Sequence, residues 1–369
     1  METTARMKVG RTDGVAAVLD MALNEGTRCS PRCLEVLAAQ RWPDALRRYG
    51  PADDGPLRRA IATAHGLDPD HVLVGNGSGV LIRTCVPAII EARIRASPVR
   101  VLRHLIARRG DPILTTWPTY SKIPASALRL GMACDPIPLL ADHTLDLARL
   151  RRRLARGGGF VYLCNPNNPT GRLVATRAQL EALVVDFPRS FFAIDEAYVE
   201  FLPPARQPDV AALVARHDNL LVLRSFSFAH GLAGAHVGYA LCNAPLAARL
   251  RERFTPHQVS ALASALAIAA LADQEHLERV RREVAIERAR LTAALEARPG
   301  VRVYPSETNF LLARASGPAR PLHDALRARG IKIKLFDPVG ALRMDEHFRV
   351  TVGLAEENTA LIAALAELP

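Results

Sequence analysis

The chain has 369 residues, of which 49% are hydrophobic and 5% aromatic, and its formal net charge at pH 7 is +11. A single hydrophobic core stops growing at roughly 250–300 residues, so the length predicts two lobes. The positive charge suits anionic ligands, but no basic and aromatic recognition pattern accompanies it, and nucleic-acid binding is therefore not expected.

Signals for a membrane, a secretion route or a metal site are missing from the sequence. No apolar run reaches the roughly 20 residues that cross a bilayer, and residues 1–10 lack the apolar centre of a secretion signal. The six cysteines are scattered, and no histidine cluster completes a metal site around Cys29 and Cys33. We expect a cytoplasmic protein with neither a membrane contact nor a bound metal.

The first strand-to-helix unit contains a glycine-rich turn. Residues 72–74 form a short apolar run, residues 75–79 read GNGSG, and a helix is expected from Val80. Backbone N–H groups and the positive end of the helix dipole point at an anion where a helix starts after such a turn. Gly77 and Ser78 are therefore candidate phosphate ligands.

Three further apolar runs alternate with helical patterns, as parallel strands joined by helices do. Residues 160–163 run into NPNNPTG at 165–171, and residues 191–194 run into DEAY at 195–198. Residues 220–223 lead into RSFSFAHGLAGAHVGY at 224–239, which we call the anchoring segment. A carboxylate at the C-terminal end of a strand, such as Asp195, can hold the proton of a pyridinium nitrogen.

The pattern changes after residue 243. Long helical segments at about 244–252, 260–272 and 277–297 precede strands near 301–304 and 309–313, an alternating strand at 331–335, and FRVTVG at 348–353. This change to a helix-rich α+β pattern predicts a second lobe. We predict an N-terminal segment at 1–40, a large domain at 41–255 and a small C-terminal domain at 256–369.

These motifs resemble those of the fold-type I aminotransferases that use pyridoxal phosphate (PLP), and in particular the histidinol-phosphate aminotransferase branch. The match covers nearly the whole chain, and NPNNPTG is its most specific part. The resemblance implies an α/β fold. Its large domain would hold a mostly parallel seven-stranded sheet between helices, followed by a smaller α+β C-terminal domain.

The resemblance also implies the site residues. Tyr120 would stack on the pyridine ring of the cofactor, Asn168 and Tyr198 would contact its phenolic oxygen, and Asp195 would hold its ring nitrogen. The cofactor phosphate would be bound by a further set of residues: Gly77, Ser78, Ser225, Ser227 and His236, with Tyr49 from the neighbouring subunit of a homodimer.

Three residues are implied for the substrate. Arg349, in FRVTVG, would bind its carboxylate through the planar guanidinium fork. Lys334 falls where the family has a basic residue for a substrate phosphate, and Asn24 would lie at the mouth of the site.

The anchoring segment departs from the family pattern at its most reactive positions. Phe228 stands where the family has the lysine that forms a Schiff base with the cofactor, and His236 stands where it has the phosphate arginine. His230 replaces an aromatic or apolar residue. A phenyl ring can neither condense with an aldehyde nor carry a proton, so ordinary lysine-dependent transamination is not expected.

Four functions remain open. In the first, the protein binds PLP or pyridoxamine phosphate (PMP) non-covalently, with His230 and Tyr198 as acid–base groups. The pKa of a histidine near 6.5 suits that role. Alternatively, it acts without a cofactor on an amino-acid-like carboxylate held by Arg349, it is a non-catalytic binding or regulatory partner, or Lys122 replaces the missing amine. His230 and His236 could also be packed histidines without chemistry. We expect an atypical enzyme of one of the first two kinds.

Overall fold

The computed structural model describes residues 18–39, 47–98, 101, 112–120, 123, 132–336 and 344–368. It divides into two compact units. The large unit contains Glu25–Ile286 and Pro305–Asn309, and the small unit contains the described residues up to Asn24, Glu287–Tyr304 and those from Phe310 onward.

This division differs from the predicted boundary near residue 255. Helix α10 (Ala261–Leu271) packs against α1 (Pro31–Ala38) and α3 (Gly55–His65) and contributes to the core of the large unit. The division falls inside the next helix, α11 (Gln274–Glu296).

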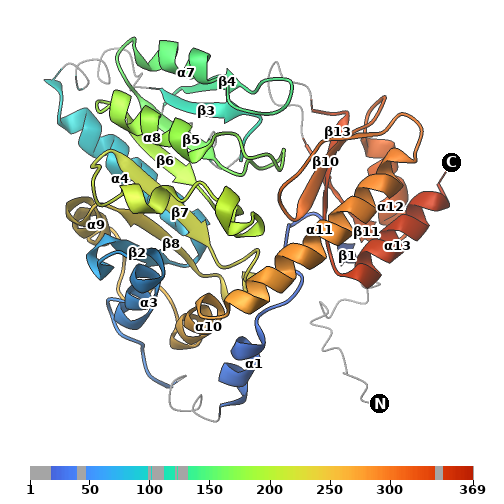
Figure 1. The fold of residues 1–369 in the computed structure, drawn as a ribbon, viewed down its shortest axis with the longest axis horizontal. Coiled ribbons are helices and arrows are strands. Elements are labelled where there is room, and N and C mark those ends of the chain that lie inside the picture. Colours follow the sequence, from blue (N-terminus) through green and yellow to red (C-terminus); the bar gives the residue numbers. More distant parts are fainter. Residues whose placement is uncertain are drawn as a thin grey trace. The chain divides into compact units, whose positions relative to one another are not determined.

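A seven-stranded sheet forms the centre of the large unit (Figure 1). Its order is β2 (Val72–Gly75), β8 (Gly238–Cys242), β7 (Leu220–Ser225), β6 (Phe191–Asp195), β5 (Phe160–Cys164), β3 (Ile113–Trp117) and β4 (Cys134–Pro138). The pairs from β7 to β4 are parallel, whereas β8 is antiparallel to both β7 and β2. The expected mostly parallel seven-stranded sheet is confirmed.

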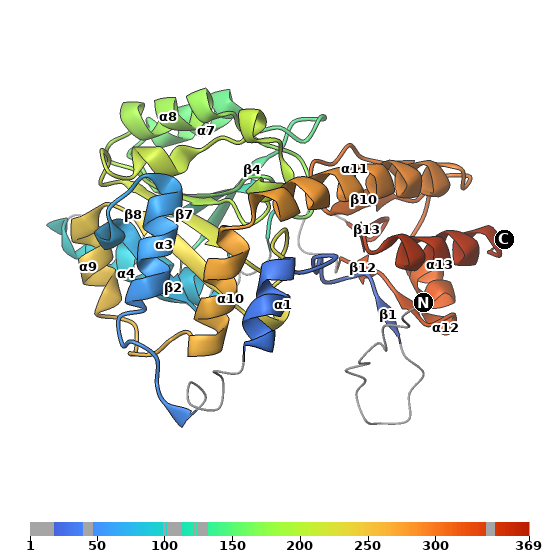
Figure 2. The same ribbon diagram turned by 60° about the horizontal axis from the view of Figure 1, so that its bottom comes forward.

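Helices cover both faces of this sheet (Figure 2). One core cluster joins the strands to α3, α7 (Leu147–Leu154), α8 (Arg177–Asp186) and α10, and the other joins them to α4 (Gly77–Arg95) and α9 (Ala244–Arg251). Successive side chains alternate between the clusters, as the pleat of a strand requires, so that Val161 faces the first and Tyr162 the second. Strands buried on both faces are apolar throughout, which is why the sequence revealed them.

The parallel strands bring the predicted motifs to one edge of the sheet. Asn165 follows β5, Asp195 ends β6 and Ser225 ends β7. Ser225 pairs with Gly238 of β8, and Gly238 pairs with Gly75 of β2, so the glycine turn after β2 lies at the same edge. Ligands of open α/β sheets bind outside the carboxyl ends of the strands.

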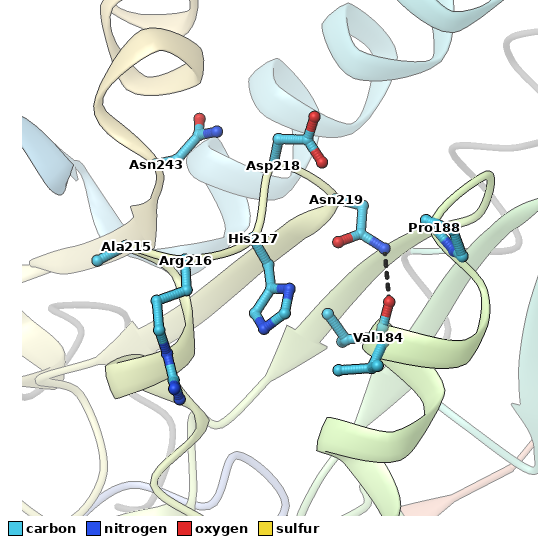
Figure 3. A pocket seen from close by; sticks show the side chains of 9 residues that line it. Val184, Pro188, Ala215, Arg216, His217, Asp218, Asn219 and Asn243 are labelled. Atoms are coloured by element: carbon cyan, nitrogen blue, oxygen red, sulfur yellow. Dashed lines mark hydrogen bonds between the residues drawn. The ribbon is translucent and has the colours of Figure 1, made fainter.

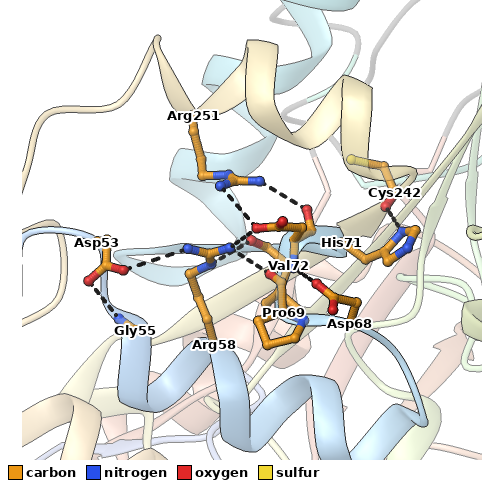
Figure 4. Close-up of polar contacts among 10 residues, drawn as sticks. Asp53, Gly55, Arg58, Asp68, Pro69, His71, Val72, Cys242 and Arg251 are labelled. Atoms are coloured by element: carbon orange, nitrogen blue, oxygen red, sulfur yellow. Dashed lines mark hydrogen bonds and ion pairs between the residues drawn. The ribbon is translucent and has the colours of Figure 1, made fainter.

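A polar network fixes the start of β2 (Figure 4). Arg58 of α3 donates from Nε to the carbonyl oxygen of Val72 (3.2 Å). Its Nη2 donates to the carbonyl oxygen of Pro69 (2.7 Å) and to Asp70 Oδ1 (3.1 Å). Arg251 of α9 donates to the carbonyl oxygen of Asp70 (3.0 Å). Two helices from opposite faces of the sheet therefore hold the strand that leads to Gly77.

The small unit contains a four-stranded antiparallel sheet in the order β12 (Lys334–Leu335), β13 (His347–Thr351), β10 (Phe310–Arg314) and β9 (Arg302–Val303). Strand β1 (Leu19–Asp20) pairs in parallel with β11 (Ile331–Lys332). Helices α12 (Arg320–Ala328) and α13 (Ala355–Ala366) belong to the same unit.

Short 3₁₀ turns complete the large unit at η1 (Pro69–His71), η2 (Val199–Phe201), η3 (Pro204–Arg206), η4 (Val210–Leu213) and η5 (Ala233–Ala235). Within the described ranges, no helix is both long enough and apolar enough to cross a membrane.

Candidate functional site

The carboxylate of Asp195 is buried at the C-terminal end of β6. The hydroxyl of Tyr162 donates to Oδ2 (2.5 Å) and the backbone N–H of Ala197 donates to Oδ1 (3.1 Å). Burial raises the pKa of Asp195, and the two donors oppose that rise by stabilising the ionised form. Since a carboxylate oxygen can accept more than one bond, the group can also receive a protonated ring nitrogen.

Three residues singled out from the sequence, Asn168, Tyr198 and Phe228, lie close together beside β6. Asn168 Nδ2 donates to the hydroxyl oxygen of Tyr198 (3.3 Å). The ring of Phe228 stacks on the ring of Tyr198, with centroids 4.3 Å apart and planes 21° from parallel. Phe228 therefore takes part in the same cluster as two predicted cofactor ligands.

Glycines allow chain segment 26–30 to lie directly behind the turn that carries Phe228. A Cβ on Gly26 would clash with the carbonyl oxygen of Phe228, and a Cβ on Gly231 would clash with that of Arg28. Gly231 also has φ +66°, a conformation that glycine adopts without strain. The backbone of the turn that carries Phe228 is thus held by close packing against segment 26–30.

The predicted phosphate ligands lie around the start of α4. His236 is exposed, and its Nε2 lies 2.9 Å from the position that a Cβ on Gly77 would take. A Cβ on Gly238 would lie 2.5 Å from the backbone nitrogen of Ser78. On β7, the hydroxyl of Ser225 accepts from the N–H of Ser227 (3.1 Å). The first turn of a 19-residue helix and an imidazole are therefore adjacent.

A buried ion-pair cluster lies at the start of the anchoring segment. Arg224 donates from Nε (3.0 Å) and Nη2 (2.8 Å) to Glu196 Oε2, and its Nη1 lies 3.7 Å from Glu200 Oε1. Burial raises the pKa of Glu200 to about 7, against the opposing charge of Arg224. This cluster was not predicted from the sequence, although the DEAY motif contains one of its carboxylates.

His230, in the anchoring segment, is a buried side chain. Its ring packs against Phe226, with centroids 4.9 Å apart, and the side chain is 2% exposed. Burial lowers its pKa to about 3, assisted by the charges of His276 and Arg224. The imidazole is therefore neutral near pH 7. Its predicted acid–base role stays a prediction, and this position weighs against it.

The two other tyrosines predicted as cofactor ligands, Tyr120 and Tyr49, lie at different places in the large unit. Tyr120 follows β3 and packs, half-buried, against the core cluster that contains α4. Tyr49 is 86% exposed, and its ring stacks on His257 with centroids 4.8 Å apart. Lys122 lies outside the described residues.

The predicted substrate ligands all belong to the small unit. Lys334 and Arg349 are direct partners across the antiparallel pair β12–β13. Arg349 is buried, donates from Nη2 to the carbonyl oxygen of Ala22 (2.6 Å), and places its guanidinium 5.2 Å from the centroid of Phe310. The backbone N–H of Asn24 donates to Thr351 Oγ1 on the same strand (3.0 Å). Two cations side by side favour an anionic ligand.

Among the residues that the structure describes, no set of three or more His, Cys, Asp or Glu side chains is arranged to hold an ion. A surface cavity of about 430 Å³, lined by Val184, Arg216, His217, Asn219 and Asn243 among others, lies at the opposite edge of the sheet, where β7 begins (Figure 3).

The chain is similar to proteins of one enzyme family. The family model for aminotransferases of class I and II matches residues 20–365. Histidinol-phosphate aminotransferases from Symbiobacterium thermophilum and Roseiflexus castenholzii are 33% and 36% identical, over 91% and 92% of this chain and 86% of each relative.

Two solved structures are also similar. The histidinol-phosphate aminotransferase of Sinorhizobium meliloti, in complex with pyridoxal-5'-phosphate, has a TM-score of 0.81 and 26% identity, over 95% of this chain and 90% of that one. The enzyme of Clostridium acetobutylicum shares the fold, with a TM-score of 0.80 and 21% identity, over 94% and 98%. The fold, the motifs at the sheet edge and these matches agree: the chain belongs to the class I and II aminotransferase family.

Proposed function

We propose that this protein binds PLP or PMP without a covalent link and acts on an amino-acid-like carboxylate, by a reaction other than ordinary lysine-dependent transamination. The proposal rests on the place of Phe228, whose ring stacks on Tyr198 among the predicted cofactor ligands. By family resemblance the Schiff-base lysine belongs at this position. A phenyl ring offers no amine to a carbonyl group and no proton to a carbon atom.

The residues of the large unit fit such a cofactor. Asp195, buried and bonded by Tyr162 and Ala197, would hold the ring nitrogen. Asn168 and Tyr198, already bonded to each other, would hold the phenolic oxygen. When bound, the cofactor supplies an electron sink for negative charge that develops on a substrate carbon. The PLP complex of the S. meliloti relative supports this cofactor class.

The phosphate would bind at the first turn of α4, beside His236. Histidine presents fewer donors than the planar fork of arginine, so it is the weaker phosphate ligand. We therefore expect reversible cofactor binding, which the missing covalent link would weaken further. Tyr198 is the acid–base candidate, because Asn168 donates a hydrogen bond to its hydroxyl and Phe228 stacks on its ring.

The substrate would be anionic. Arg349 would bind its carboxylate, and Lys334, its neighbour across the strand pair, would bind a second anionic group such as a phosphate. The names of the relatives, histidinol-phosphate aminotransferases, support a phosphorylated amino-acid-like compound. We further propose a cytoplasmic homodimer in which Tyr49 completes the partner subunit's phosphate site.

A gain-of-function substitution tests the role of Phe228. Phe228→Lys should restore an amine at the family position, so PLP should become attached and borohydride should fix it at residue 228. Wild type and Phe228→Leu should bind PLP saturably without a stable adduct. Mass spectrometry of reduced, digested protein checks this, and the chain contains only four lysines, which keeps the assignment clear.

Two results would contradict the proposal. A reduced adduct on Lys122 of the wild type would show that this amine replaces the missing one. Absence of PLP and PMP binding by the wild type would favour a cofactor-free reaction or a non-catalytic role. Incubation with candidate amino acids, followed by mass analysis of the products, separates these two, since Arg349→Ala should abolish any turnover.

A further inference from the structure

One buried amide joins two predicted ligand-bearing segments of the large unit. Asn167 is 0% exposed, and its Nδ2 donates to the carbonyl oxygen of Pro118 (3.1 Å) and to Thr170 Oγ1 (3.0 Å). Pro118 lies two residues before Tyr120, on the segment after β3. Thr170 lies two residues after Asn168, on the turn after β5. The amide therefore spans segments 49 residues apart in the chain.

The backbone of Asn167 is fixed as well. Its N–H donates to the carbonyl oxygen of Arg172 (2.8 Å), and its own carbonyl oxygen accepts from the N–H of Gly171 (2.7 Å). These two bonds close the turn 167–172 on itself. The Asn167 side chain thus extends from a hydrogen-bonded turn to Pro118, so it can couple the position of the turn to that of the neighbouring segment.

We propose that Asn167 is a positioning residue, which holds segment 117–120 in register with the turn that carries Asn168, so that both segments form one ligand-binding surface. The inference rests on the proposed cofactor, because Tyr120 and Asn168 are its predicted ring and phenolic-oxygen ligands. Asn167 itself is buried behind this surface and need not touch the ligand.

Two substitutions separate hydrogen bonding from filling of space. Asn167→Ala removes both donors and leaves two acceptors without their bond, so the dissociation constant of PMP should rise about tenfold or more. Asn167→Asp keeps the shape but turns an acceptor oxygen toward the carbonyl of Pro118. If the donors matter, the Asp variant should bind PMP no better than the Ala variant.

Asn219 provides a matched control (Figure 3). It is 6% exposed, and its Nδ2 also donates to two carbonyl oxygens, those of Val184 (3.1 Å) and Phe187 (3.5 Å). It precedes β7 and therefore lies at the sheet edge away from Asp195. Asn219→Ala should lower stability to a similar extent as Asn167→Ala and leave PMP affinity unchanged.

The experiment combines PMP titration with amide hydrogen exchange of the cofactor-free full chain. Asn167→Ala should speed exchange in peptides covering 113–120 and 165–173, and Asn219→Ala should not. The proposal is overturned if exchange there equals that of the control, if PMP affinity is unchanged despite faster exchange, or if the Asp variant binds like wild type. If wild type binds no PMP, the cofactor proposal fails, and the exchange result alone decides whether Asn167 holds the two segments.

Discussion

His230 should make the stability of the protein depend on pH. Its pKa is lowered to about 3 by burial and by the charges of His276 and Arg224, whereas a histidine in an unfolded chain has a pKa of about 6.5. Between these values the unfolded state binds more protons than the folded state. The stability contribution of His230 is therefore complete above about pH 6.5 and falls as the pH drops, by about 2 kcal/mol at pH 5.

Replacement of His230 by Phe tests this dependence. The ring of Phe can pack against Phe226 as the imidazole does, and it does not titrate. Denaturant unfolding at about pH 7.5 and pH 5 should show that the wild type loses about 2 kcal/mol more than the variant. Exposed His236, replaced by Gln, is the control and should leave the wild-type pH dependence intact. An equal loss in wild type and His230→Phe would contradict the assignment.

At the scale of single residues, sequence patterns predicted the residues of known motifs but not the residues that hydrogen-bond to them. Asn168 and Tyr198 were predicted from family motifs, and the structure brings them together. Tyr162 lies within an apolar run and resembles an ordinary core residue. Its bond to Asp195 depends on the parallel register of β5 and β6, in which Tyr162 is paired with Ala193, two residues from the carboxylate. A pairing of that kind leaves no local signal in the sequence.

Among the elements, the anchoring segment depends on a close approach of two backbones. A Cβ on Gly231 would clash with the carbonyl of Arg28, and the residue has φ +66°. Gly231→Ala should therefore reduce the free energy of unfolding by about 2 kcal/mol or more.

Gly234 is the matched control for this substitution. It lies in the same segment, within η5, and a Cβ there would meet no atom within 4 Å. Gly234→Ala should change the free energy of unfolding by no more than about 0.5 kcal/mol. Denaturant titration of both variants checks the difference. Equal stability of the two would mean that segment 26–30 moves aside without cost.

The strands could be predicted because each carries its own signal. Runs such as 160–163 and 191–194 are buried on both faces and are therefore apolar throughout. The predicted helices at about 244–252, 260–272 and 277–297 correspond to α9, α10 and α11. Their partners could not be predicted, because an apolar helix face does not specify which surface it covers. For that reason the predicted boundary near 255 separated α10 from the unit that contains it.

At the scale of the whole molecule, the organisation of the small unit depends on pairing between strands that are far apart in the sequence. Leu19 pairs with Ile331 and Asp20 with Lys332, so the start of the described chain belongs with its last third. Periodicity and turn residues report only on neighbours in the sequence, and they assigned residues 1–40 to a separate segment. The family resemblance placed Arg349 and Lys334 in one substrate site, and their pairing on β12 and β13 agrees with a shared anionic ligand.

The proposed homodimer makes Tyr49 a ligand of the partner subunit's site. The side chain is 86% exposed, and its one described ring contact is with His257, so its hydroxyl contributes little to the stability of one chain. Sedimentation should give twice the chain mass of 40.1 kDa. Tyr49→Phe should stay dimeric and equally stable but bind PMP about tenfold more weakly, because a hydrogen bond to a charged phosphate is lost. Tyr304→Phe in the small unit should bind PMP like wild type. A monomeric wild type, or unchanged affinity in Tyr49→Phe, would contradict the shared site.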